Sequence, residues 1–404
     1  MLRKGKRRSW LGALFVLAVA AVAAAGQSSA QPASQAPIKV GFLNQEKGAV
    51  AFPDFGAGAR VARAYVNAKL DGISGRPLQF VECLTDGSPE SSIDCANRFV
   101  ESKVVVVLEG IDFGADAALP ILKAAGIPLV GHTAFGAAQL VSKHSFFFGA
   151  ALPAYGAAPL KLMSKTLRVK SVVYMGQDNA VVRAFVESSA FVPVAKKLGM
   201  AINTVLFNAV SPDFTQIVTT ALANRPDALF FTSSEPDCTG LVSAIRQLGF
   251  KGPVFAGSCT AFISADPQAA EGVYTSNDLW APSAAGAAPK AKAAELMTFV
   301  AQMKKGAPKY VASGFAQFSF SSTMDIASIL RRVTGKITPA SVIRQLRSTK
   351  NLPSFMGQPI TCDGKQWPGQ PSACAGGVIV FRVHNGARQK FSNGFVYAKD
   401  LVGS

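Results

Sequence analysis

The sequence lacks the motifs that nucleotide binding, serine hydrolysis and zinc catalysis require. It contains no GxxxxGKS/T phosphate loop, no GxSxG nucleophile elbow and no HExxH zinc motif, and no GxGxxG follows its first expected strand. Only three histidines are present, with no CxxC or HxxxH spacing that could hold zinc. We therefore expect a protein with no catalytic residues, no cofactor and no metal.

Acidic residues are also scarce, since 24 Asp and Glu stand against 41 Lys and Arg, giving a formal net charge of +17. Five of the basic residues lie within the first thirty positions, and the others are scattered, with no run longer than a pair such as Arg331-Arg332. The aromatic and basic interleaving of nucleic-acid-binding modules is missing. We therefore expect no nucleic acid partner.

The N-terminus has the pattern of an export signal. A basic segment precedes the apolar run Leu11–Ala25, and small-residue cleavage sites follow near residues 25 and 30. The run has fifteen residues, fewer than the ~20 that a helix needs to span a membrane. We expect a signal peptide at 1–30, a flexible leader rich in Pro, Ala, Ser and Gln at 31–37, and a location in the periplasm. Arg7–Leu11 resembles a twin-arginine signal, and an ordinary Sec signal fits equally well. There is no cysteine near the cleavage sites, so we do not expect a lipoprotein anchor.

The six cysteines fall into three local couples. In an exported chain they are expected to form disulfides, and of the fifteen possible connectivities the spacing favours the local one. Each bridge would close a short loop, worth on the order of 3 kcal/mol in the chain-entropy treatment. The expected pairs are Cys83 with Cys95, Cys238 with Cys259, and Cys362 with Cys374.

Short apolar strands alternate with helical patterns from Ile38 onward. Two consecutive runs of four strand and helix units, each about 110 residues long, are interrupted near Phe146-Phe147-Phe148. Strands separated by helices of ten or more residues indicate parallel sheets covered on both faces. Because 404 residues are enough for two or three domains, we expect two similar doubly wound α/β lobes.

The carboxyl ends of the expected strands carry polar residues. In open parallel sheets ligands bind beyond these ends, and the helices that follow present N-terminal amides to anions. The segments are 44–52, 109–113 and 131–135 in the first lobe, and 176–179, 232–235 and 257–260, which includes Ser258, in the second. A binding site between the lobes is the natural expectation.

Four segments taken in order resemble the leucine-, isoleucine- and valine-binding proteins of ABC importers. They are Ile38–Phe42, Gly58–Pro77, Ala125–Gly131 and Leu248–Pro253. The region of Cys362 and Cys374 is similar to the C-terminal part of disulfide-bearing members, so that the resemblance extends from Ile38 to the C-terminus.

The resemblance implies a type I periplasmic binding protein, in which two Rossmann-like lobes joined by three crossovers close on a ligand like a Venus flytrap. The expected crossovers are 148–154, 274–280 and 351–355. The first lobe then comprises 38–148 plus 280–352, and the second 149–279 plus 353–404. The implied partners are a small-molecule ligand, amino-acid-like or a carboxylate compound, and an ABC transporter permease, with the receptor itself a monomer.

The family's ligand contacts correspond to particular positions here. The implied first-lobe contacts are Phe52, Asp112, Phe113, His132, Thr133 and Ala134, and the second-lobe contacts are Asn179, Ser234, Glu235 and Ser258. Two second-lobe aromatics of the family are replaced near Asn179 and at Ser234, which leaves room for a larger ligand. The carboxylate that pairs with a ligand ammonium falls near Cys259, so binding of a plain branched-chain amino acid is doubtful unless Asp112, Glu235 or Asp237 substitutes.

Two other functions fit the same sequence. A ligand-sensing module whose closure is detected by a partner protein would have the same fold, and a permease and ATPase encoded beside the gene would distinguish the two. A secreted α/β enzyme would need a nucleophile or metal motif that the sequence does not contain. Turnover of a bound compound would favour the enzyme.

Overall fold

The computed structural model describes residues 36–402 apart from 49, 188–190 and 209. The predicted signal peptide at 1–30 and most of the leader at 31–37 lie outside the described residues. Within the described part, no helix is both long and apolar enough to cross a membrane.

The first sheet has six strands in the order β11-β5-β4-β3-β1-β2, all parallel. Its strands are β1 (Ile38–Gln45), β2 (Leu78–Thr85), β3 (Val107–Glu109), β4 (Leu129–Gly131), β5 (Ser145–Ala150) and β11 (Ala373–Ala375). Its helices are α1 (Pro53–Lys69), α2 (Pro89–Glu101), α3 (Ala115–Ala124), α4 (Ala137–Val141), α12 (Lys290–Gly306), α13 (Gly314–Arg331) and α14 (Pro339–Ser348). Separate apolar cores on the two faces show that helices cover the sheet on both sides, as its nearly continuous apolar strands predict.

The second sheet continues from five parallel strands into an antiparallel edge, in the order β13-β12-β10-β9-β8-β6-β7 with β14 beside β12. Its parallel strands are β6 (Ser171–Gln177), β7 (Ala201–Phe207), β8 (Ala228–Thr232), β9 (Val254–Phe255) and β10 (Tyr274–Asn277), and the others are β12 (Gly377–His384), β13 (Ala387–Lys390) and β14 (Val396–Tyr397). Its helices are α5 (Ala154–Lys165), α6 (Ala180–Glu187), α7 (Val192–Lys197), α8 (Phe214–Ala223), α9 (Glu235–Gln247), α10 (Ala261–Ala265) and α11 (Pro267–Ala270). The short 3-10 turns are Pro282–Ala287, Pro308–Tyr310 and Lys399–Leu401.

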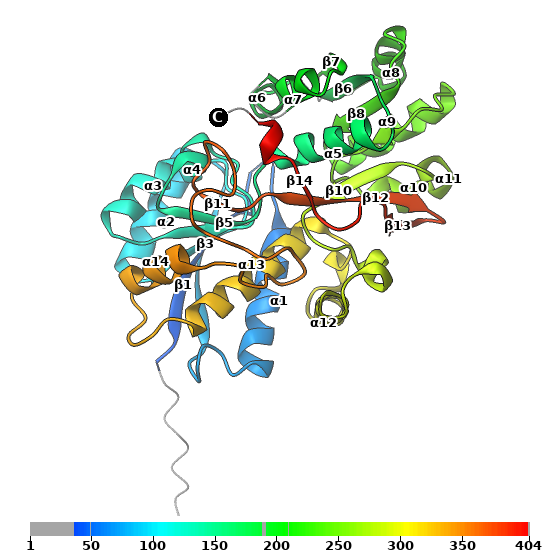
Figure 1. The fold of residues 1–404 in the computed structure, drawn as a ribbon. Helices are drawn as coiled ribbons and strands as arrows, with labels where there is room; N and C mark the ends of the chain where they lie inside the picture. The colour runs from blue at the N-terminus through cyan, green and yellow to red at the C-terminus, as the bar shows by residue number, and fades with distance from the viewer. Residues whose placement is uncertain (1–35, 49, 188–190, 209, 403–404) are drawn as a thin grey trace, which may run out of the picture. The chain divides into compact units, whose positions relative to one another are not determined.

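Local sequence explains why the helices start where they do. The hydroxyl of Ser88 accepts a hydrogen bond from the Ser91 amide at the start of α2, and Pro89 occupies the first turn, where its missing N–H costs nothing. Ser313 caps α13 in the same way. Helix α13 packs along α1 (Figure 1) at a point where only glycine fits, because a Cβ on Gly58 would lie 2.1 Å from the Ala316 carbonyl oxygen.

The chain crosses between the sheets three times, as expected, but the third crossing comes later than the sequence predicts. The first crossing follows β5 and the second follows β10, inside the expected segments 148–154 and 274–280. The third was expected at 351–355, yet β11 pairs with β5 in the first sheet, so the chain leaves that sheet only after Ala375. Ile360 and Cys362 are buried in the core of the first lobe, which holds residues 353–375 there rather than in the second lobe.

The structure has all three expected disulfides, Cys83–Cys95, Cys238–Cys259 and Cys362–Cys374, and none of its cysteines is free. The prediction of two doubly wound lobes joined by three crossings is confirmed. The sequence did not predict β5, β10, β11 or β13 as strands.

Candidate functional site

A cavity of about 200 Å³ lies where strand ends of both sheets meet the first crossing. The β4 loop, α13, the first crossing with α5, α6, and the ends of β8 and β9 all contribute to its wall. The lining residues are Thr133, Phe135, Leu152, Tyr155, Val182, Phe185, Thr232, Gly257, Ser258, Phe315 and Phe318. The cavity therefore occupies the position that open parallel sheets reserve for ligands, beyond the carboxyl ends of the strands.

The first-lobe wall of the cavity is built from phenylalanine rings. The ring centroid of Phe315 lies 6.2 Å from that of Phe318 and 5.7 Å from that of Phe52. Phe52 in turn lies edge-on to Phe113 at 5.7 Å, and Phe113 lies edge-on to Phe135 at 6.5 Å. Edge-to-face contacts of this length are favourable, and they join the rings into one apolar surface.

Two hydroxyl groups in the cavity wall are buried next to each other and next to the Asp278 carboxylate, and neither makes a hydrogen bond of ordinary geometry. They are Oγ1 of Thr133 and the phenol oxygen of Tyr155. Burial, together with the nearby Asp278 carboxylate, raises the pKa of Tyr155 well above its usual value, so that the phenol keeps its proton. Each hydroxyl can therefore donate a hydrogen bond to a ligand, and an unpartnered buried polar group is the kind of exception that calls for a function.

A buried hydrogen bond between His132 and Asp278 ties the end of β4 to both of the first two crossings. Nε2 of His132 lies 2.9 Å from the carboxylate of Asp278, which also accepts a 2.6 Å hydrogen bond from the backbone amide of Ala150. The imidazole ring stacks on the ring of Phe318 at 4.2 Å. His132 thus lies behind the cavity wall and positions Phe318 and the residues next to the crossings.

The three carboxylates that could have replaced the family's ammonium partner all have partners within the protein. Asp112 is buried and accepts hydrogen bonds from the hydroxyls of Thr85 and Ser92, at 2.9 and 2.6 Å. Glu235 accepts from the backbone amides of Thr260 and Ala261, both at 2.8 Å.

Asp237, the third of these carboxylates, accepts from Gln177 and Ser233, both at 2.6 Å. None of the three carboxylates lines the cavity. In the described part of the chain, no group of three or more His, Cys, Asp or Glu side chains is arranged to hold a metal ion.

The remaining expected contacts are divided between the cavity and the scaffold. Thr133 and Ser258 line the cavity, and Phe52 and Phe113 belong to the aromatic wall beside it.

Three other expected contacts lie outside the cavity lining. Ala134 is buried in the core beneath β4. The side chains of Asn179 and Ser234 accept hydrogen bonds from amides at the starts of α6 and α9.

Sequence reasoning missed most of the apolar lining. Tyr155 follows the first crossing, Phe185 lies on α6, and Phe315 and Phe318 lie on the first two turns of α13. The only available signal was the spacing of Phe315 and Phe318, since residues three apart lie on one face of a helix. That spacing also fits an ordinary core-facing stripe.

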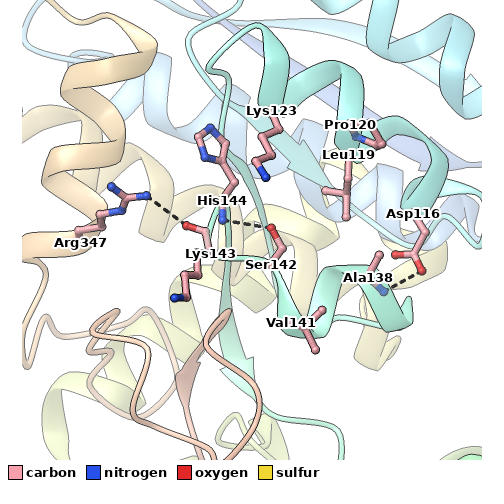
Figure 2. A pocket seen from close by; sticks show the side chains of 10 residues that line it. All are labelled: Asp116, Leu119, Pro120, Lys123, Ala138, Val141, Ser142, Lys143, His144 and Arg347. Atoms are coloured by element: carbon pink, nitrogen blue, oxygen red, sulfur yellow. Dashed lines mark hydrogen bonds between the residues drawn. The ribbon is translucent and has the colours of Figure 1, made fainter.

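A larger cavity, about 580 Å³, lies in the first lobe between α3, α4 and Arg347 of α14 (Figure 2). It contains none of the expected ligand contacts, and His144 in its wall directly precedes β5, at the amino end of the sheet. Burial, with help from Arg347 and Lys123, lowers the pKa of His144. All of its lining residues belong to the first lobe, which separates this cavity from the ligand site between the lobes that the fold predicts.

The fold and the position of the smaller cavity define a two-lobed solute-binding receptor. The sequence profile of the family described as periplasmic binding protein matches residues 37–386, and the chain belongs to this family. The fold class predicted from the sequence, a type I periplasmic binding protein, is confirmed, and this is the fold of substrate-binding receptors. A search of curated proteins finds no match.

Several solved structures share the fold at low sequence identity. The leucine-binding protein LivK of Thermotoga maritima is 20% identical, with a TM-score of 0.67 over 90% of this chain and 99% of that one. LivJ, a branched-chain amino acid binding protein from Streptococcus pneumoniae solved with isoleucine, is 19% identical, with a TM-score of 0.67 over 88% and 99%. A fatty acid transporter substrate-binding protein from Thermomonospora curvata is 15% identical, with a TM-score of 0.69 over 90% and 93%.

Proposed function

We propose that this protein is the extracytoplasmic receptor of an ABC importer. It captures a small organic ligand in the cavity between its lobes and delivers the ligand to a membrane permease. The observation that carries the proposal is the pair of unpartnered hydroxyls, Thr133 and Tyr155, in an otherwise apolar cavity at the strand ends. A ligand that accepts hydrogen bonds from them would remove the cost of leaving them buried alone.

The export signal and the three disulfides support a periplasmic location, where a soluble receptor can meet its ligand before import. The importer receptors among the similar structures, one named for branched-chain amino acids and one for fatty acids, support the role but differ in ligand. We propose that the receptor works as a monomer. Its partner is the permease rather than a second copy of the chain.

The first test is recovery of the natural ligand. Mature protein purified from the periplasm of the producing cell and then denatured should release one small molecule in stoichiometric amount, identified by mass spectrometry. Titration of that molecule into refolded protein should reproduce binding. Thr133→Val should weaken the binding, whereas Thr219→Val, which removes a hydroxyl from the exposed face of α8, should not.

The second test concerns delivery. The ATPase activity of the permease complex encoded nearby, reconstituted in liposomes, should rise when loaded receptor is added outside. Stimulation of a signalling partner without any effect on the ATPase would contradict the transport role. Conversion of the released molecule into a product by the receptor would contradict the assignment as a binding protein.

A further inference from the structure

Two adjoining hollows on the first lobe are lined by basic side chains. The larger is the cavity of about 580 Å³ in Figure 2, and the smaller, about 440 Å³, shares Lys143 and Arg347 with it. Their cations come from α3, from the segment between α4 and β5, from α14 and from the loop that the disulfide Cys362–Cys374 closes. They are Lys123, Lys143, Arg347 and Lys365. The fold thus gathers on one surface basic residues that are scattered along the sequence.

These four cations are not neutralised by carboxylates of the protein. Within the described residues, none of them forms a salt bridge. The walls contain two carboxylates, and both are held by amides. Asp116 accepts hydrogen bonds from two backbone amides of α4, both at 3.0 Å, and Asp363 accepts from the Lys365 amide and the Gln366 side chain, both at 2.9 Å. Four cations therefore stand against two carboxylates, and this excess of positive charge favours a negatively charged partner.

His144 lies among these charges in the wall of the larger hollow. Its Nε2 is buried and makes no hydrogen bond of ordinary geometry. Burial lowers the pKa of His144, and the charge of Arg347 lowers it further. The Gly126 carbonyl acts in the opposite direction, and Lys123 adds to the lowering. A negative group bound in the hollow would oppose the effect of the two cations, so the titration of His144 reports whether the hollow is occupied.

The hollows also contain apolar side chains. Leu119, Pro120 and Val141 line the larger one, and Val141 is 62% exposed. Phe146 and Pro371 line the smaller one. An extended acidic peptide fits both properties, because its carboxylates meet cations along the two hollows while an apolar side chain covers Val141. A small anion such as phosphate has no part that would cover the apolar surface.

From these observations we propose that this surface docks an acidic segment of a partner protein. We call it the basic surface, and its cations are Lys123, Lys143, Arg347 and Lys365. All of its residues belong to the first lobe, and none of them lines the cavity between the lobes. The inference therefore goes beyond the proposed function, since a partner held there leaves the ligand cavity free.

A pair of peptides tests the charge of the partner. The probe is the labelled peptide Glu-Glu-Leu-Glu-Glu-Leu-Glu-Glu, and its control carries the same label and has Gln in place of every Glu. Fluorescence anisotropy with the full mature protein gives the dissociation constants. At about 50 mM salt the acidic peptide should bind at least about tenfold more tightly than its Gln control. Raising the salt to about 500 mM should weaken the acidic peptide by about tenfold, because salt screens exposed charges.

Charge-reversal variants locate the peptide on the surface. Lys143→Glu/Arg347→Glu changes the two cations that both hollows share, and it should weaken the acidic peptide by at least about tenfold. The matched control is Lys251→Glu/Lys390→Glu, which makes the same change of charge at two exposed positions of the second lobe. The control should bind the peptide like the parent protein. Both double variants should keep the thermal unfolding midpoint of the parent, so that a loss of affinity is not a loss of folding.

A second readout places the bound peptide next to His144. The chain has three histidines, so proton NMR resolves their titration, and His144→Asn assigns the relevant signal. The pKa of His144 should rise when the acidic peptide saturates the protein, because its carboxylates offset Arg347 and Lys123. A peptide that binds without changing the titration of His144 lies elsewhere, and the proposal is then wrong.

The other outcomes that overturn the proposal are equally specific. Equal weakening by the two double variants would show general attraction to a positively charged protein rather than docking. If inorganic phosphate or vesicles containing phosphatidylglycerol bind the basic surface and the acidic peptide does not, the occupant is a small anion or a membrane instead of a protein segment. No peptide binding at about 50 mM salt would also refute docking. None of these results bears on the ligand cavity, so the receptor function is tested separately.

Discussion

Two hydroxyls at the end of β4 and the start of α5 illustrate how a binding site departs from the rules of a stable interior. Thr133 Oγ1 and the Tyr155 hydroxyl are buried without a hydrogen bond of ordinary geometry, and an unsatisfied buried polar group costs up to about 1–3 kcal/mol in the free protein. A valine and a phenylalanine would fill the same space without that cost. The wild-type residues are therefore better suited to a bound state than to the free one, which is why they point to ligand binding more strongly than any charged residue nearby.

Asp325 provides a prediction about pH at the scale of one side chain. Its carboxyl group is buried in α13, where it accepts hydrogen bonds from Ser354 and the Phe355 amide, and burial raises its pKa to about 7. The folded protein then holds a proton that the unfolded chain has already lost above pH 4. Because the folded state binds the extra proton, this group makes the protein less stable as the pH rises from about 4 to about 7.

Asp325→Asn should remove that dependence. Between pH 5 and pH 8 the free energy of unfolding of the parent protein should fall relative to the variant by about 3 kcal/mol, at about 1.4 kcal/mol per pKa unit. Urea unfolding at the two pH values measures the difference. The free energy of unfolding of Asp94→Asn, at an exposed position of α2, should change with pH as that of the parent does. If the free energy of unfolding of Asp325→Asn also changed with pH as that of the parent does, the elevated pKa would be contradicted.

Single residues also show what the sequence could and could not predict of the site. Thr133 and Ser258 were expected because they follow apolar strands, and the parallel topology brings such positions to one edge. Phe185, Phe315 and Phe318 were missed because their approach depends on how helices far apart in the sequence pack. Asp112 and Glu235 were expected to face a ligand, yet each satisfies donors in its own lobe, which only coordinates reveal.

At the scale of elements, α1 and α13 pack closely and so hold Phe52 and Phe315 together. Gly58 makes the close approach possible, since a Cβ there would lie 2.1 Å from the Ala316 carbonyl oxygen and 2.3 Å from the Ser319 hydroxyl. Gly58→Ala improves helix propensity by about 1 kcal/mol, but the helices must separate to accommodate the methyl group.

We expect Gly58→Ala to lower the free energy of unfolding by about 1–3 kcal/mol, measured by chemical denaturation, because overpacking outweighs propensity. Gly314→Ala is the control, since nothing lies within 4 Å of a Cβ at that position on α13. It should be neutral or slightly stabilising. A Gly58→Ala protein as stable as the Gly314→Ala protein would show that the contact between α1 and α13 can relax without cost.

The disulfides differ in their relation to the cavity, and this leads to a prediction for whole segments. Cys238–Cys259 joins α9 to the loop that presents Gly257 and Ser258, whereas Cys83–Cys95 joins β2 to α2 and has neither cysteine in the cavity wall. Replacing either pair by alanine should cost roughly 3 kcal/mol of stability. Only the Cys238/Cys259 variant should also bind its ligand more weakly, by about tenfold, when titrated at a temperature where both variants are folded. Equal affinities would show that the loop holds its position without the bridge.

The sequence predicted helices and strands well where the spacing of apolar residues agrees with the burial of the element. It predicted them poorly where the two conflict. The strands β1, β2 and β7 were found because short segments rich in apolar residues lie between clear helices and turns. In contrast, the end of β5 was assigned to the crossing expected at 148–154, although Ser145–Ala150 is buried throughout. The strand β11 is only three residues long, and its place in the first sheet depends on pairing with β5, more than 200 positions earlier. Pairing over such a distance leaves no local pattern.

For the whole molecule, the two sheets share a single binding site. The cavity takes Thr133 and Phe318 from the first lobe and Phe185 and Ser258 from the second, so a ligand inside it contacts both. Three chain segments cross between the sheets, and the pair of His132 and Asp278 fastens the end of β4 to the second crossing. A ligand that binds the closed arrangement of the lobes more tightly than the open one shifts the equilibrium toward the closed arrangement. The size of the shift is set by the ratio of its affinities for the two arrangements.

We therefore predict that saturating ligand decreases the radius of gyration of the mature protein in small-angle X-ray scattering, through closure about the three crossings. The same ligand concentration added to Thr133→Val, which should bind ten- to a hundredfold more weakly, should give a smaller change that grows to the full value as more ligand is added. This control separates closure from effects of the compound on the solvent. If scattering stays unchanged at a concentration where calorimetry shows full occupancy, then the ligand enters a cavity that is already formed. In that case, recognition by the permease must depend on local differences in the cavity wall rather than on the approach of the lobes.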